Sequence, residues 1–309
     1  MNGVLVIDKP KGWTSHDVVA WARKALRIRK VGHGGTLDPL ATGVLPLYLG
    51  EGTKLAPFNL DGIKDYVATM KLGQETDTLD ADGKITAEKE GFHCTREMVE
   101  EKLDPFRGKI RQRPPLYSAV KQKGVPLYQR ARSGETPEVA ERETVIHALR
   151  LKEFSFPLVT LEVTCGRGAY IRSLCADLGR ALGCGAHVVE LRRTRSGRFT
   201  LGQAMTLEEV SRRVEQRKVE EKILPLRESV DLTGEIQLEE KAAVRVRQGQ
   251  PLRLSDLPGG GSEGFRRGQR WGLLQGPCGL LAIAESQVDA GPSLTGNAPV
   301  LRILRVFHG

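Results

Sequence analysis

Residues 31–50 decide the fold and read Val31-Gly-His-Gly-Gly-Thr-Leu-Asp-Pro-Leu-Ala-Thr-Gly-Val-Leu-Pro-Leu-Tyr-Leu-Gly50. One acid, Asp38, lies among glycine, small and aliphatic residues. The glycines permit close backbone approaches that a side chain forbids, and Pro39 biases Asp38 towards extended backbone. The apolar run 44–49 predicts a buried strand. We therefore expect a carboxylate on a shaped loop beside space for a ligand, although Asp-Pro and the glycines also suit an ordinary turn.

The totals favour a globular protein with a polyanionic partner. The chain has 309 residues, which suits one large domain and a smaller one, and its hydrophobic content of 39% is enough for a substantial core. There are 47 Lys and Arg against 38 Asp and Glu, a formal net charge of +9. This charge favours nucleic acid as a partner, while the alternative is that it only aids solubility.

No sequence pattern indicates a metal or a cofactor. The five cysteines form no Cys-x-x-Cys pair and suit neither zinc nor a disulfide framework, so we expect reduced, buried thiols. Residues 73–83 resemble a calcium loop, but the first ligand position would be Thr78 and the closing one Lys89. The apolar run at the N-terminus, 4–7, is too short for a signal peptide or a membrane span. We expect a cytoplasmic protein without a membrane partner.

The apolar periodicity predicts a mixture of strands and helices. Strands are expected at 4–7, from Tyr66 onward, at 159–165 and at 187–191, and helices after Thr14 or Ser15, over 95–103 with Met98, Val99 and Leu103 inward, over 171–182, and after a capping box at Thr206. After about residue 230, short apolar runs divided by Gly/Pro turns suggest a small all-β barrel.

Two further groups of residues carry chemistry or charge. Tyr170 and Arg172 fall in the first turn of the buried helix, where the helix dipole disfavours an arginine, so Arg172 needs a carboxylate partner unless it faces solvent. Five basic residues crowd the stretch before the Gly-His loop and form either a solvated face or a phosphate contact: Arg23, Lys24, Arg27, Arg29 and Lys30.

The stretch from Gly32 to Gly43 resembles the catalytic-aspartate motif of the TruB family, the bacterial tRNA pseudouridine-55 synthases. The family pattern is Gly-His-x-Gly-x-Leu-Asp-Pro-x-Ala-x-Gly, and this chain departs from members that have threonine where Gly34 stands. Residues 111–121 match a second family block. The resemblance covers residues 3 to about 225 strongly and the remainder loosely.

The resemblance implies an α+β fold with a mixed, mainly antiparallel sheet and flanking helices. It places the catalytic domain over residues 1–230, with an inserted thumb that grips RNA at about 117–143, for which the alternative is disorder in the free protein. Residues 231–309 would form a small β-barrel, a PUA-like RNA-binding domain.

The resemblance also implies the site and the reaction. Asp38 would be the nucleophile that isomerises a flipped-out uridine 55 in the T-arm of tRNA, attacking either C1′ or C6. Arg172 would pair with Asp38 and keep it ionised, and Tyr66 would stack on the base and help C5 lose its proton. The remaining substrate-binding residues are expected to be His33, Tyr170, Leu191 and Lys9. We expect a monomer that needs no cofactor and no obligate protein partner.

Two other classes of function remain open at this point. The first is an RNA-binding protein that keeps the fold without catalysis. The second is a hydrolase in which Asp38 and His33 form an acid–base pair.

Overall fold

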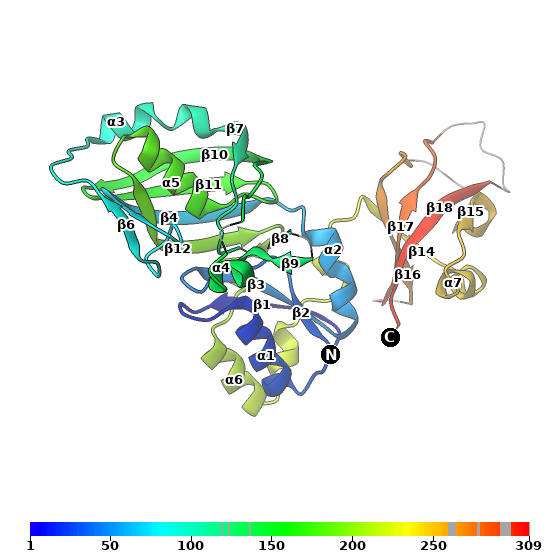
Figure 1. The fold of residues 1–309 in the computed structure, drawn as a ribbon. Coiled ribbons are helices and arrows are strands. Elements are labelled where there is room, and N and C mark those ends of the chain that lie inside the picture. The colour runs from blue at the N-terminus through cyan, green and yellow to red at the C-terminus, as the bar shows by residue number, and fades with distance from the viewer. Residues whose placement is uncertain are drawn as a thin grey trace.

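A nine-stranded sheet forms the larger part of the molecule (Figure 1). The computed structural model describes residues 1–118, 120–122, 124–135, 137–258, 264–276, 279–290 and 298–308. The main path of the sheet runs β1 (Gly3–Lys9), β3 (Thr42–Leu49), β12 (Ala186–Ser196), β4 (Lys64–Leu72), β11 (Leu158–Cys165), β10 (Arg142–Ser155) and β7 (Gly108–Gln112). Two short strands attach to it, β2 (Val31–His33) on β3 and β13 (Phe199–Thr200) on β12.

Nearly every strand pair in this sheet is antiparallel. The exception is β3 against β12, which run parallel and pair Thr42 with Arg192 and Gly43 with Arg193. The predicted mixed, mainly antiparallel sheet is therefore confirmed. This parallel junction also brings the loop before β3 next to the middle of β12, where the candidate site lies.

Helices flank the sheet and begin where the sequence signals predict. Thr14 caps α1 (Ser15–Leu26) and forms a reciprocal capping box with Asp17, and Thr206 does the same with Glu209 for α6 (Leu207–Glu215). In Figure 1, α1 and α6 lie together at one end, whereas α5 (Ile171–Ala181) packs against β12 and β4. Smaller elements complete this part of the chain: α2 (Ala56–Asn59), β5 (Gln74–Thr76), β6 (Ile85–Glu88), β8 (Lys121–Gln122), β9 (Val125–Pro126) and α4 (Leu127–Arg132).

Helix α3 (Arg96–Glu101) corrects one detail of the sequence analysis. Val99 and Leu103 are buried as predicted, but Met98 is 39% exposed. Val99 and Leu103 are four residues apart and share one face of the helical segment, and Met98 falls outside this narrow stripe. Cys94, Cys165, Cys175 and Cys184 are free and buried as predicted, and Cys278 lies outside the described residues.

A second, five-stranded sheet follows, with the order β14 (Gly234–Gln237), β16 (Arg270–Gln275), β17 (Gly279–Ser286), β18 (Pro299–Val306) and β15 (Leu252–Arg253). Its core includes α7 (Glu240–Arg247), a helix that the sequence analysis did not anticipate. Ala242, Ala243 and Val246 of this helix are buried. The sheet is consistent with a PUA-like domain.

The second sheet is attached to the first through apolar and polar contacts. One apolar cluster contains residues of both, including Val6 and Tyr48 from the first and Ile283 from the second. Lys54 donates a hydrogen bond to the carbonyl of Val306 at 2.8 Å. Within the described residues, no helix is both long and apolar enough to cross a membrane.

Gly43 tests whether the β3–β12 junction tolerates a side chain. A Cβ at Gly43 would lie 2.2 Å from the carbonyl oxygen of Arg193, and its φ is +98°. Gly12 has a similar φ of +84°, but a Cβ there would meet no other atom within 4 Å. We expect Gly12→Ala to lower the free energy of unfolding by about 1–2 kcal/mol, and Gly43→Ala by at least about 1 kcal/mol more, because of the overlap.

Urea denaturation of the two variants and the parent chain measures both values. An equal decrease in the free energy of unfolding for the two variants would show that the β3–β12 junction accommodates a side chain at position 43 without loss of stability.

Candidate active site

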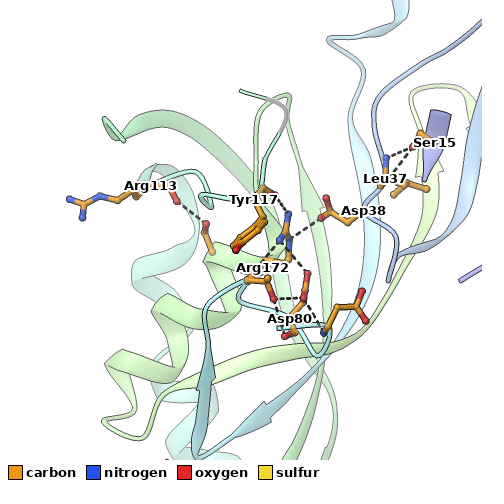
Figure 2. A network of polar contacts seen from close by, with 10 residues as sticks. Ser15, Leu37, Asp38, Asp80, Arg113, Tyr117 and Arg172 are labelled. Atoms are coloured by element: carbon orange, nitrogen blue, oxygen red, sulfur yellow. Dashed lines mark hydrogen bonds and ion pairs between the residues drawn. The ribbon is translucent and has the colours of Figure 1, made fainter. Parts of the chain in front are cut away.

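Asp38 lies on the loop between β2 and β3, and Ser15 at the start of α1 fixes the backbone beside it (Figure 2). The Leu37 N–H donates to the Ser15 hydroxyl at 2.8 Å, and this hydroxyl donates back to the Leu37 carbonyl at 3.1 Å. Ser15 is almost completely buried. The loop is therefore held on the residue directly before the acid.

Lys9 holds the other side of the loop. Its ammonium donates to the carbonyls of Trp13 at 2.6 Å, Pro10 at 2.9 Å and Pro39 at 3.3 Å. The side chain is completely buried, and burial lowers its pKa to about 8. Lys9 was expected to bind substrate; in the structure its ammonium is held by these carbonyls, and Lys9 is not among the residues that line the cavity described below.

Arg172, the second residue of α5, joins three loops (Figure 2). Its Nε lies 2.9 Å from the Asp38 carboxylate and its Nη1 lies 3.2 Å from Asp80. The two Nη atoms also donate to the carbonyls of Thr78 at 2.8 Å and Tyr117 at 2.9 Å. The Arg172 side chain is only 4% exposed. The carboxylate partner predicted for Arg172 is therefore present as Asp38, and Asp80 is a second one.

The electrostatics of Asp38 differ from the expectation. Burial raises the pKa of Asp38 above its ordinary value, and the positive charge of Arg172 opposes this rise without overcoming it. The negative charge of Asp80 raises the pKa of Asp38 further. An arginine partner alone would keep Asp38 ionised by lowering its pKa, but Arg172 shares its charge between two carboxylates in a buried setting.

The Asp38 side chain is 33% exposed, and it opens into a cavity of about 280 Å³. This volume lies just below the range typical of small-ligand pockets, roughly 300–1,000 Å³. Polar and apolar groups share the wall: Gly35, Thr36, Leu37, Asp38, Leu60, Lys64, Tyr66, Ser118, Gly166, Arg167, Gly168, Ala169, Tyr170, Ile171, Arg172, Leu191 and Arg193. The cavity is large enough for one base with its sugar.

Three of the other predicted residues meet at this cavity. Tyr66 of β4 and Leu191 of β12 are buried and lie in its wall, and Tyr170 precedes α5. The side-chain amide of Gln112 fixes Tyr170, because it accepts from the Tyr170 N–H at 3.0 Å and donates to the Tyr170 carbonyl at 3.2 Å. Burial raises the pKa of both tyrosines, so both phenols are neutral near pH 7.

His33 is not part of this wall. It ends β2, its Nδ1 is buried without a hydrogen-bond partner in the described chain, and burial lowers its pKa. Next to it, Gly34 leaves no room for a side chain, because a Cβ there would lie 2.7 Å from the ring of Tyr48. Tyr48 therefore occupies the space that a side chain at position 34 would need in this chain.

The five basic residues at 23–30 separate into two groups. Arg23 donates to the carbonyl of Val31 and Lys30 pairs with Glu51 at 3.2 Å. The other three are exposed and form no ion pair within the described residues: Lys24, Arg27 and Arg29. These three remain available for phosphate contacts.

Sequence reasoning missed two charged residues of the site. Asp80 lies in the segment 73–83, which resembles a calcium loop but has the wrong residues at the ligand positions. Arg193 follows Leu191 by two residues in β12, and side chains two apart in a strand share one face. The prediction that Leu191 lines the pocket could therefore have indicated Arg193 as well.

Comparison with known proteins places this fold among the pseudouridine synthases. Among solved structures, the chain is similar to a Cbf5-Nop10-Gar1 complex, with a TM-score of 0.75 and 29% identity, covering 99% of this chain and 85% of that chain. It is equally similar, with a TM-score of 0.75 and 27% identity, to a chain of an H/ACA RNP bound to a substrate RNA containing 2′-deoxyuridine, with the same coverage.

Sequence comparison gives the family. Residues 23–171 match the N-terminal domain of the TruB family pseudouridylate synthases, and residues 172–231 match a tRNA pseudouridylate synthase B C-terminal domain. The chain is 42% identical to tRNA pseudouridine synthase B of Geobacter sulfurreducens over 100% of both chains. It is 41% identical to that of Syntrophus aciditrophicus over 100% of this chain and 99% of the relative. The chain belongs to the TruB family of pseudouridine synthases, and it is therefore an isomerase.

Arg172→Lys tests the four contacts of the guanidinium. A lysine keeps the charge, but its single ammonium cannot reach two carboxylates and two carbonyls in the planar arrangement of a guanidinium. We expect pseudouridine formation to fall by roughly 10²-fold or more, since small misplacements of reacting groups have effects of this size. Arg180→Lys on the same helix, where Arg180 is 60% exposed and pairs with Asp177, should change the rate little. A normal rate of pseudouridine formation in Arg172→Lys would show that the guanidinium is not required for activity.

The raised pKa of Asp38 predicts the acid side of the pH–rate profile. We expect activity to require ionised Asp38, so kcat/KM should fall as the pH drops through a value above the ordinary 3.8. Asp80→Asn removes a charge that raises this pKa, so the acid limb should move to lower pH. Asp82→Asn, an exposed position in the same loop, is the control. If the acid limb of the pH–rate profile stays at the same pH in Asp80→Asn, the charge of Asp80 does not raise the pKa of Asp38.

Proposed function

We propose that this protein isomerises uridine 55 in the T-arm of tRNA to pseudouridine, with Asp38 as nucleophile. The relatives named tRNA pseudouridine synthase B support tRNA as the substrate. The observation that carries the chemistry is the pairing of Asp38 with Arg172 at the wall of a cavity of base size. The position of the target uridine rests on the family resemblance.

The cavity cannot accept a base that is still stacked in a folded RNA loop. The target must therefore be extruded, which costs a few kcal/mol (roughly) of lost stacking. The exposed basic residues Lys24, Arg27 and Arg29, together with Arg167 at the cavity, are suited to hold the RNA backbone and offset this cost. His33 is proposed to occupy part of the space that the base leaves in the RNA.

Asp38 then attacks either C1′ of the ribose or C6 of the base. The bond between N1 and C1′ breaks, the uracil rotates, and C5 bonds to C1′. The bond from Asp38 to C1′ or C6 breaks in turn, and its electron pair returns to the carboxylate. Tyr66 first gives its phenol proton to solvent, and its phenolate then takes the proton on C5. The electron pair of the C5–H bond forms the double bond between C5 and C6, and N1 takes up a proton from solvent. Atoms and electrons balance without an external oxidant or reductant, and the product has the mass of the substrate.

The hydrolase alternative has little support in this geometry. It requires His33 to act with Asp38, but His33 does not line the cavity into which Asp38 opens. A non-catalytic RNA-binding role does not explain why the buried Arg172 holds the carboxylate of Asp38 at the cavity wall. We further propose that the enzyme works in the cytoplasm as a monomer, without a protein partner.

Asp38→Asn tests the proposed nucleophile. The amide keeps the size of the side chain but cannot attack, so turnover should fall by roughly 10⁴-fold or more, as happens when a covalent catalyst is removed. The affinity for RNA should stay within a few-fold. Tritium release from C5-labelled tRNA transcript measures turnover with the purified chain alone, and nucleotide-resolution mapping locates the product.

Asp104→Asn, at a side chain that is 80% exposed, is the matched control. A normal rate in Asp38→Asn would refute the nucleophile, and product at a uridine other than 55 would refute the proposed target. Activity that appears only after another protein is added would refute the absence of a partner.

A further inference from the structure

Three arginines of β12 differ in their partners. Arg192 pairs with Asp8 and Arg195 pairs with Asp65, each with its closest atoms 2.6 Å apart. Arg193 lies between them and makes no ion pair within the described residues, although only 1% of it is exposed. A buried charge without a counter-charge is costly, so a specific role must compensate for Arg193.

The donors of Arg193 point to the candidate active site. Its Nε donates to the carbonyl of Val44 at 2.8 Å and its Nη2 donates to the carbonyl of Gly35 at 2.9 Å. The guanidinium also acts on the phenol of Tyr66, whose pKa it lowers. Arg193 and Tyr66 are register partners across β12 and β4 and both line the cavity. Side chains directly opposite each other in an antiparallel pair lie on the same face within contact distance.

The surroundings of Tyr66 otherwise disfavour a negative phenol oxygen. Burial raises the pKa of Tyr66, and the nearby groups Cys165 and Asp38 act in the same direction. The positive charge of Arg193 opposes them. Lys64 also lines the cavity, but its ammonium is engaged by the carbonyls of Leu60 and Gly62.

We propose that Arg193 is the positioning residue for Tyr66, holding the phenol against the bound base and compensating the negative charge that its oxygen carries before it accepts the C5 proton. This inference rests on the proposed function. In the step concerned, the Tyr66 phenol first gives its proton to solvent. The C5–H bond then breaks, the phenolate oxygen takes the C5 proton, and the electron pair stays on the uracil. The carbonyls of Val44 and Gly35 fix the guanidinium, so its charge is in place before the base enters.

The first test is a double-mutant cycle between Arg193 and Tyr66. Arg193→Gln should slow the single-turnover rate by roughly tenfold or more in the parent chain and much less in a Tyr66→Phe background, because the two residues act together. Arg193→Lys should recover part of the rate, since it restores charge but not the fork. RNA affinity should stay within a few-fold in all variants. Arg192→Lys and Arg195→Lys are the matched controls on the same strand.

The second test needs no activity. With 3-fluorotyrosine in place of tyrosine, the ¹⁹F resonance of Tyr66 is assigned by its loss in Tyr66→Phe. Its titration midpoint should rise in Arg193→Gln, because a charge that lowers the pKa of this phenol has been removed, and should lie between the two in Arg193→Lys. If Arg193→Gln does not fold, Arg193→Lys alone decides, since its midpoint must still move.

The outcomes separate this inference from the proposed function. An unchanged Tyr66 resonance and midpoint in a folded Arg193 variant would overturn the inference, as would equal rate losses with and without the Tyr66 hydroxyl. A shifted midpoint in a chain that forms no pseudouridine would support the contact between the two side chains and refute the proposed function.

Discussion

The site depends on one buried guanidinium that is shared between two carboxylates. Arg172 contacts Asp38, Asp80 and two carbonyls, so a single side chain holds the loop before β3, the loop after β5 and the segment after β7 against the start of α5. Removing one partner of such a buried pair leaves an uncompensated charge. The shape of the cavity and the charge of its acid therefore depend on the same interaction.

Two buried arginines at the cavity wall contact different functional groups. Arg172 faces the acid that is proposed to attack, and Arg193 faces the tyrosine that is proposed to take the proton. Both are fixed by backbone carbonyls from segments remote in the sequence, so their positions do not depend on the substrate. Fixed charges aimed at groups that change charge during a reaction are the most effective form of electrostatic catalysis.

Short-range patterns in the sequence predicted the parts of the structure that short-range forces determine. The capping box at Thr14 and the loop around Asp38 could be recognised because their residue types act on their own backbone. The burial of Lys9, the pairing of Asp80 and the place of Arg193 depend on which distant carbonyl or carboxylate folds over each side chain. No local pattern contains that information. The raised pKa of Asp38 was missed for the same reason, since it follows from burial and from a second acid 42 positions further along the chain.

The most direct test of the central claim is a crystal structure of the Asp38→Asn chain with a T-arm stem-loop bound. The account predicts that the target uridine lies outside the stacked loop, in the cavity, with its ring against Tyr66. Its C1′ or C6 should lie roughly 3–3.5 Å from the side chain of residue 38, the distance of a group about to react. A uridine that stays stacked in the RNA, or that binds away from residues 38 and 172, would contradict the account.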